Sequence, residues 1–126
     1  GKIKQEVEVP NLVVTTGKNF IASRMKDASA TAMTHMAIGT GSTSAAAGDT
    51  ALGSEAGRVA LTSTTVTSNA VAYVASFPAG TGTGAITEAG LLNASSSGTL
   101  LCRTVFSVIN KASGDTLGIT WTVTVS

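Results

Sequence analysis

The stretch LGITWTVTVS, Leu117 to Ser126, alternates apolar residues with small or hydroxyl-bearing ones. Successive side chains of a β-strand point to opposite faces of a sheet, so this period of two predicts a strand, which we extend back to Asp115. Its apolar face, centred on Trp121, is expected to lie on a core. Its row of threonines is expected to face water or a partner.

Similar runs upstream of this strand predict a β protein. They are rich in β-branched or alternating residues and are separated by Gly, Ser and Asn, which favour turns. The further predicted strands are Lys2–Val9, a short strand within residues 31–41, Arg58–Thr67, Ala70–Phe77, Ala85–Asn93 and Leu100–Ile109. A hairpin turn is expected at Ser68 and Asn69, and a bulge at Gly90. About seven strands predict a mainly β fold, a single-domain antiparallel β-sandwich.

The N-terminal part of the chain predicts an arm followed by the one short helix. Residues 1–15 form the expected arm, in which apolar and charged residues alternate until a proline interrupts the pattern. Such an arm can pair within its own sheet or add a strand to a neighbouring copy, and the sequence leaves both alternatives open. The helix is expected at about Thr16 to Lys26, with Thr16 as its N-cap. Residues 16–126 make up the predicted sandwich domain.

A long segment of small residues, about Gly39 to Gly57, is predicted to be a loop. Long loops on a rigid scaffold are often the places where partners bind. We therefore expect partner contacts from this loop and from the apolar positions of the arm. The candidate contact residues are Ile3, Val7, Val9, Thr43 and Asp49.

The predicted core combines the apolar positions of the strands with those of the helix. It includes Phe20, Ile21, Met36, Ile38, Leu61, Tyr73, Phe77, Leu91, Leu101, Phe106, Ile119, Trp121 and Val123. The single cysteine, Cys102, lies in an apolar run and is expected to be a buried thiol. Two ion pairs are predicted as structural contacts, Glu55 with Arg58 and Glu88 with Arg103 across strands.

The composition argues against several classes of partner. Charged residues make up 12% of the 126 residues and the formal net charge is +1, so no basic patch is expected to attract nucleic acid or anionic lipid. No apolar run is long enough to span a membrane, and no secretory leader is recognisable. We expect a chain that is neither membrane-bound nor secreted. A surface with so little charge also favours self-association.

The sequence contains no group of residues that predicts catalysis. His35 is the only histidine, and no strand-turn-helix with a G-x-S-x-G elbow is present. The glycines near Gly39 and Gly80 lack the lysine and the helix of a phosphate-binding loop, so they are interpreted as turn glycines. We expect no enzyme activity, no cofactor and no metal site.

Three long stretches together resemble a module of tailed-bacteriophage virion proteins: Thr34–Ser63, Val71–Ala94 and Leu100–Val125. The patterns M-A-I-G-x-G…L-x-x-E…R and I-T-E-A-G-L in the first two are similar to the N-terminal attachment domain of phage tail-fibre proteins. The third stretch resembles small phage structural proteins that carry this module alone. The resemblance implies no catalytic residues, but residues that shape the fold: Met36–Gly39, Leu52, Glu55, Arg58 and Ile86–Leu91.

The resemblance implies a non-enzymatic structural protein on the outer surface of a phage particle, made in the host cytoplasm. Because these 126 residues contain no fibre shaft, the leading hypothesis is a capsid decoration or cement protein. Its expected partners are the major capsid protein and copies of itself, for example in a trimer. The alternatives are a tail-fibre or baseplate attachment protein, with tail or baseplate partners, and a carbohydrate-binding module.

Overall fold

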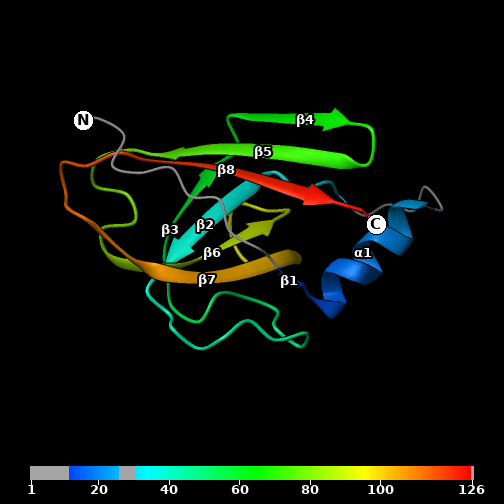
Figure 1. Cartoon of the computed structure of the whole chain (residues 1–126), viewed down its shortest axis with the longest axis horizontal. Coiled ribbons are helices and arrows are strands. Elements are labelled where there is room, and N and C mark those ends of the chain that lie inside the picture. Colours follow the sequence, from blue (N-terminus) through cyan, green and yellow to red (C-terminus); the bar gives the residue numbers. More distant parts are fainter. Residues whose placement is uncertain (1–11, 26–30, 126) are drawn as a thin grey trace.

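The computed structural model describes residues 12–25 and 31–125, and these form eight strands and one helix. The strands make two antiparallel sheets packed as a β-sandwich, which confirms the predicted fold class (Figure 1). The elements are β1 Leu12–Val13, α1 Thr15–Met25, β2 His35–Gly39, β3 Glu55–Ala60, β4 Ser63–Thr67, β5 Ala70–Phe77, β6 Gly84–Leu92, β7 Leu100–Lys111 and β8 Leu117–Thr124. No helix in this part of the chain is long and apolar enough to cross a membrane. The predicted strand Lys2–Val9, with Ile3, Val7 and Val9, lies outside the described residues.

The larger sheet has five strands in the order β1-β7-β6-β2-β3, and the smaller has the order β4-β5-β8. In the larger sheet, β6 is central and pairs with both β2 and β7. In the smaller sheet, β5 pairs with the hairpin strand β4 on one side and with β8 on the other, where Tyr73 lies opposite Trp121. The helix α1 lies at one end of the sandwich (Figure 1).

The strand β8 has the predicted alternation over its whole length. Leu117, Ile119, Trp121 and Val123 are buried, and the threonines between them are exposed. Val125 was predicted to continue the buried face, and this prediction is wrong because it lies beyond the end of β8 and is 55% exposed. The periodicity therefore predicts the strand correctly but extends it too far.

The predicted strand Arg58–Thr67 is wrong as a single element, because the chain changes sheets within it. β3 belongs to the five-stranded sheet and β4 to the three-stranded one. At the crossing, the N–H of Leu61 donates to the carbonyl of Thr34 at the start of β2, whereas the N–H of Thr62 donates to Val74 in β5. The hairpin of β4 and β5 around Ser68 and Asn69 is as predicted.

Two local predictions about backbone geometry are also wrong. Gly90 is not a bulge: it pairs in regular register with Arg103, and the register of β6 with β7 shifts near Thr87 and at Leu92 instead. A Cβ on Gly90 would collide with the side chain of Leu52, so the glycine permits a close approach of the loop that follows β2.

Thr16 does not cap α1. The carbonyl of Val14 accepts the N–H of Lys18, which makes Val14 the N-cap residue. The hydroxyl of Thr16 donates instead to the carbonyl of Leu100, at the start of β7, over 3.0 Å. The threonine therefore fixes the helix to the sheet from within its first turn.

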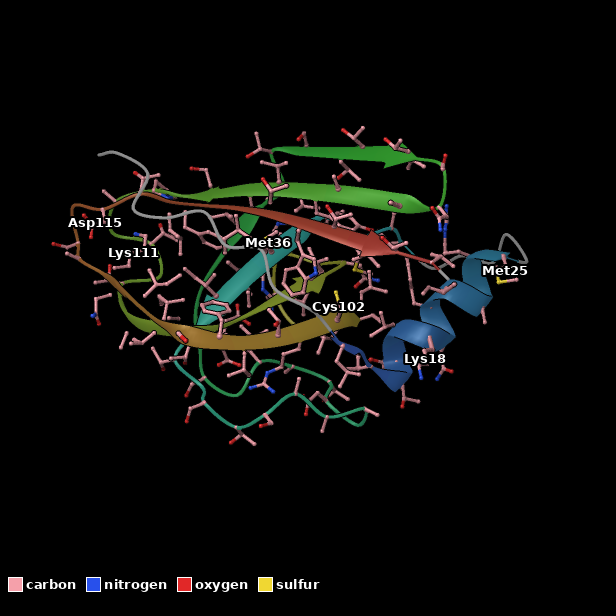
Figure 2. The ribbon with its side chains drawn as sticks, in the orientation of Figure 1. Lys18, Met25, Met36, Cys102, Lys111 and Asp115 are labelled. Atoms are coloured by element: carbon pink, nitrogen blue, oxygen red, sulfur yellow. The ribbon has the colours of Figure 1, made fainter. Side chains whose placement is uncertain are left out.

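The core lies between the two sheets, where Figure 2 shows Met36 and Cys102. Cys102 is fully buried, as predicted. Nine of the thirteen predicted core residues are buried, whereas Phe20, Ile21, Leu61 and Phe106 are only partly buried and pack against the core. A second, smaller cluster lies on the other face of the five-stranded sheet and consists of Val14, Ala37, Leu52, Leu92 and Leu100.

Candidate functional site

The loop of residues 40–54, between β2 and β3, covers the outer face of the five-stranded sheet (Figure 1). Leu52 is its only buried hydrophobic residue and packs into the smaller cluster. The N–H of Thr15 donates to the carbonyl of Ala47 over 2.7 Å, which connects the loop to the start of α1. The segment is thus a third layer of the molecule, although it contains no helix or strand.

Glu88, on β6, lies beneath this loop with no exposed surface. Its Oε1 accepts hydrogen bonds from the N–H of Gly53 at 2.7 Å and from Nε of Arg103 at 2.9 Å. Its Oε2 accepts from the N–H groups of Gly41 and Ser54, both at 2.7 Å. One carboxylate therefore binds both ends of the loop to the sheet.

Arg103, on the neighbouring strand β7, binds the middle of the same loop. Its Nη1 donates to Oδ2 of Asp49 at 3.0 Å, and its Nη2 donates to the carbonyl of Thr43 at 2.9 Å. Asp49 Oδ2 also accepts the N–H of Ala46, which closes a turn within the loop. We call this pair of side chains, Glu88 and Arg103, the loop anchor.

The backbone around the loop anchor leaves no room for side chains at two glycines. A Cβ on Gly41 would collide with the Glu88 carboxylate, and a Cβ on Gly39 would collide with the carbonyl of Ser54. The loop backbone can donate to the carboxylate only because these positions are glycine. Thr87 adds a contact from β6, since its hydroxyl donates to the carbonyl of Gly41 at 2.7 Å.

The electrostatics of Glu88 reflect two opposing effects. Burial alone would raise the pKa of this carboxyl group, but the hydrogen bonds from Ser54, Gly53, Arg103 and Gly41 outweigh burial and lower the pKa. Glu88 is therefore ionised at neutral pH, and its negative charge is matched by the adjacent guanidinium. Four donors occupy its two oxygens, so the carboxylate serves to hold the loop.

The other titratable groups of note are also engaged in the fold. Burial raises the pKa of the Cys102 thiol. Burial also lowers the pKa of Lys111, partly offset by Asp115, and its Nζ donates to the carbonyl of Pro78. Figure 2 shows Lys111 and Asp115 at the end of the sandwich opposite α1. His35 contacts the hydroxyl of Thr34 through Nδ1 at 2.7 Å.

Among residues 12–25 and 31–125, no three His, Cys, Asp or Glu side chains gather where they could hold a metal ion. The ion pair of Glu55 with Arg58, predicted from the sequence, is present and bidentate, with distances of 2.7 and 2.9 Å. Arg58 also donates to the carbonyls of Ala94 and Ser97, so it connects β3 to the turn between β6 and β7.

The structure brings two candidate contact residues, Thr43 and Asp49, to one place, around Arg103. The sequence predicts the pair of Glu88 with Arg103, but it gives no sign that the pair is buried under the loop. It also does not identify the backbone donors of Gly41, Gly53 and Ser54. The glycines of the M-A-I-G-x-G pattern are the one feature that could have pointed to them.

Comparison with known proteins adds no relative to this description. The chain matches no family model, no curated protein and no solved structure.

Proposed function

We propose that this protein is a non-enzymatic structural component of a tailed-phage particle, most simply a decoration or cement protein on the outer capsid surface. The supporting observation is where the residues of the resemblance lie. Gly39 and Gly41 belong to the first pattern and Glu88 to the second, and the Glu88 carboxylate accepts the N–H of Gly41 and lies where a Cβ on either glycine would be. Leu52, further along the first pattern, lies in the same way where a Cβ on Gly90 of the second pattern would be. Residues on which the resemblance rests thus maintain the geometry of one surface loop.

The loop has properties that suit repeated contact with a large assembly. Its residues 42–44 are exposed, and Thr43 offers its side chain to the outside while its carbonyl is held by Arg103. A loop that is already ordered loses little conformational entropy on binding. Weak contacts of this kind become strong when many copies bind a symmetric particle.

The test is the copy number of this chain in purified virions, measured by quantitative mass spectrometry against the major capsid protein. A decoration protein is expected at a copy number comparable to that of the capsid subunit. A few copies to a few tens per particle would favour the second candidate, a tail-fibre or baseplate attachment protein. Absence of this chain from purified virions would contradict both candidate functions.

A carbohydrate-binding role has less support. Sugar sites use exposed aromatic rings, but the only tryptophan and the only tyrosine, Trp121 and Tyr73, are 5% and 8% exposed. Both lie in the core between the sheets. We expect no binding of this protein on a glycan array.

A further inference from the structure

The three-stranded sheet β4-β5-β8 carries no charged residue and no histidine on any strand. The whole segment from Val59 to Thr87 is free of charge. On the outer face of this sheet, Thr65, Ala72 and Thr122 lie side by side, one on each strand. A sheet exposed to water normally carries charges, and their absence is typical of a surface that meets another protein.

The strand β4 is one of the two edges of this sheet, and β8 is the other. β4 pairs with β5 on one side, and among the described residues no strand pairs with its other side. All five of its residues are exposed, including Val66 at 70%. Proteins usually protect such edges with charges, proline or a bulge, because unpaired N–H and C=O groups recruit further strands. β4, with the sequence STTVT, has none of these.

The edge strand β3 of the other sheet provides a contrast. It carries Glu55 and Arg58, whose ion pair lies at the edge. β8, the other edge of the smaller sheet, is uncharged like β4, but its inward-facing residues are buried, whereas every residue of β4 is exposed. Among the two edges of the smaller sheet, β4 is therefore the one that is both uncharged and exposed along its whole length.

We propose that β4 pairs with β4 of a second copy of this chain, antiparallel about a twofold axis at Thr65. Only this register pairs all five residues. It places Thr65 opposite Thr65 of the second copy, and each Val66 opposite a Thr64 on the same face. Pairs of threonines and β-branched residues are favourable across antiparallel strands, and with no charges present nothing opposes the contact. The product is a continuous six-stranded sheet.

The inference rests on β4 and its surroundings, not on the proposed role in a virion, and would stand if the chain were absent from particles. Pairing along five residues buries less than the ~1,200 Å² of a stable complex, so the dimer is expected to be weak in solution. On a surface where copies are held close together, the effective concentration would favour it.

A cysteine at the axis tests the register directly. In Thr65→Cys, the two Cα atoms would lie about 4.5–5.5 Å apart, within the range of a disulfide. The native Cys102 is fully buried, so it does not compete. We expect a disulfide-linked dimer on mild oxidation of Thr65→Cys. The matched control is Thr120→Cys, an exposed threonine on β8 of the same sheet, which should stay monomeric. No dimer in Thr65→Cys, or equal dimer in the control, would overturn the proposal.

Charge substitutions test the native association by sedimentation up to about 1 mM, where a dissociation constant of that order gives half occupancy. The wild-type chain should dimerise, and Thr65→Lys should weaken the dimer at least about tenfold through like charges at the axis. Thr120→Lys should leave the strength of the dimer unchanged. An equimolar mixture of Thr65→Lys and Thr65→Glu should restore dimers. A wild-type monomer at all concentrations, a trimer, or a dimer unaffected by Thr65→Lys would overturn the proposal.

Discussion

Glu88 and Glu55 each form an ion pair with an arginine, but the Glu88 pair is buried and the Glu55 pair lies at the surface. Glu88 has no exposed surface, and loss of its charge would leave Arg103 buried opposite a neutral group. Glu55 lies at the surface, where water can replace its contact with Arg58. Removing one partner of a buried pair is much more destabilising than removing an exposed one.

We therefore expect Glu88→Gln to lower the free energy of unfolding by about 3–5 kcal/mol. Glu55→Gln, the matched control, should lower it by about 0–1 kcal/mol. Urea denaturation at pH 7, followed by the fluorescence of Trp121, measures both changes. Equal losses for the two variants would mean that the loop anchor contributes no more than a surface ion pair.

Two glycines of the same loop offer a second comparison at this scale. A Cβ on Gly41 would collide with the Glu88 carboxylate, whereas a Cβ on Gly48 would meet nothing within 4 Å. Gly41→Ala should destabilise the protein by about 1–3 kcal/mol, the range for overpacking a buried site. Gly48→Ala should change stability by less than about 1 kcal/mol. Thermal melting of the two variants compares them, and a tolerated Gly41→Ala would show that the loop can move away from Glu88.

At the scale of elements, β8 contributes a row of alternate buried residues to the core from the smaller sheet. Trp121 is 5% exposed and lies in the main core cluster, so Trp121→Ala should cost about 3–5 kcal/mol. Its Nε1 has no hydrogen-bond partner among the described residues. Trp121→Phe removes that buried N–H and should therefore cost clearly less. Val125→Ala, at an exposed position just past the strand, is the control and should be nearly neutral. An unchanged melting temperature in Trp121→Ala would contradict the packing of β8.

The elements also show how far the sequence can predict this fold. The alternation of β8 is local, and it predicted the buried face correctly. The break between β3 and β4 was not predictable, because a run of β-branched residues is compatible with either sheet and only the partners of Leu61 and Thr62 decide between them. The pair of Glu88 with Arg103 was predicted because the two residues lie on neighbouring predicted strands. The burial of the pair could not be predicted, because it depends on the path of a loop whose sequence has no periodicity.

For the molecule as a whole, the loop anchor predicts how stability depends on pH. The pKa of Glu88 is lowered by folding, so its contribution is fully present above the pKa of an unfolded glutamate, about 4.3, and is lost as pH falls through the lower, folded value. Stability should therefore decline with acid below about pH 4.3. In Glu88→Gln this decline should be smaller. Urea denaturation between pH 7 and pH 3 measures it, and parallel curves for wild type and variant would assign the acid sensitivity to other carboxylates.

The loop anchor also determines the order in which the molecule can assemble. Residues 40–54 are synthesised well before Glu88 and Arg103, which hold them, so the loop has no fixed path until β6 and β7 have been made. The smaller sheet can be completed only later, because β8, the second partner of β5, is the last strand to be synthesised. Contacts between residues so distant in sequence form slowly, since long loops must close first. Folding is therefore expected to follow synthesis of the domain, with the open edge of β4 exposed to other chains in the meantime.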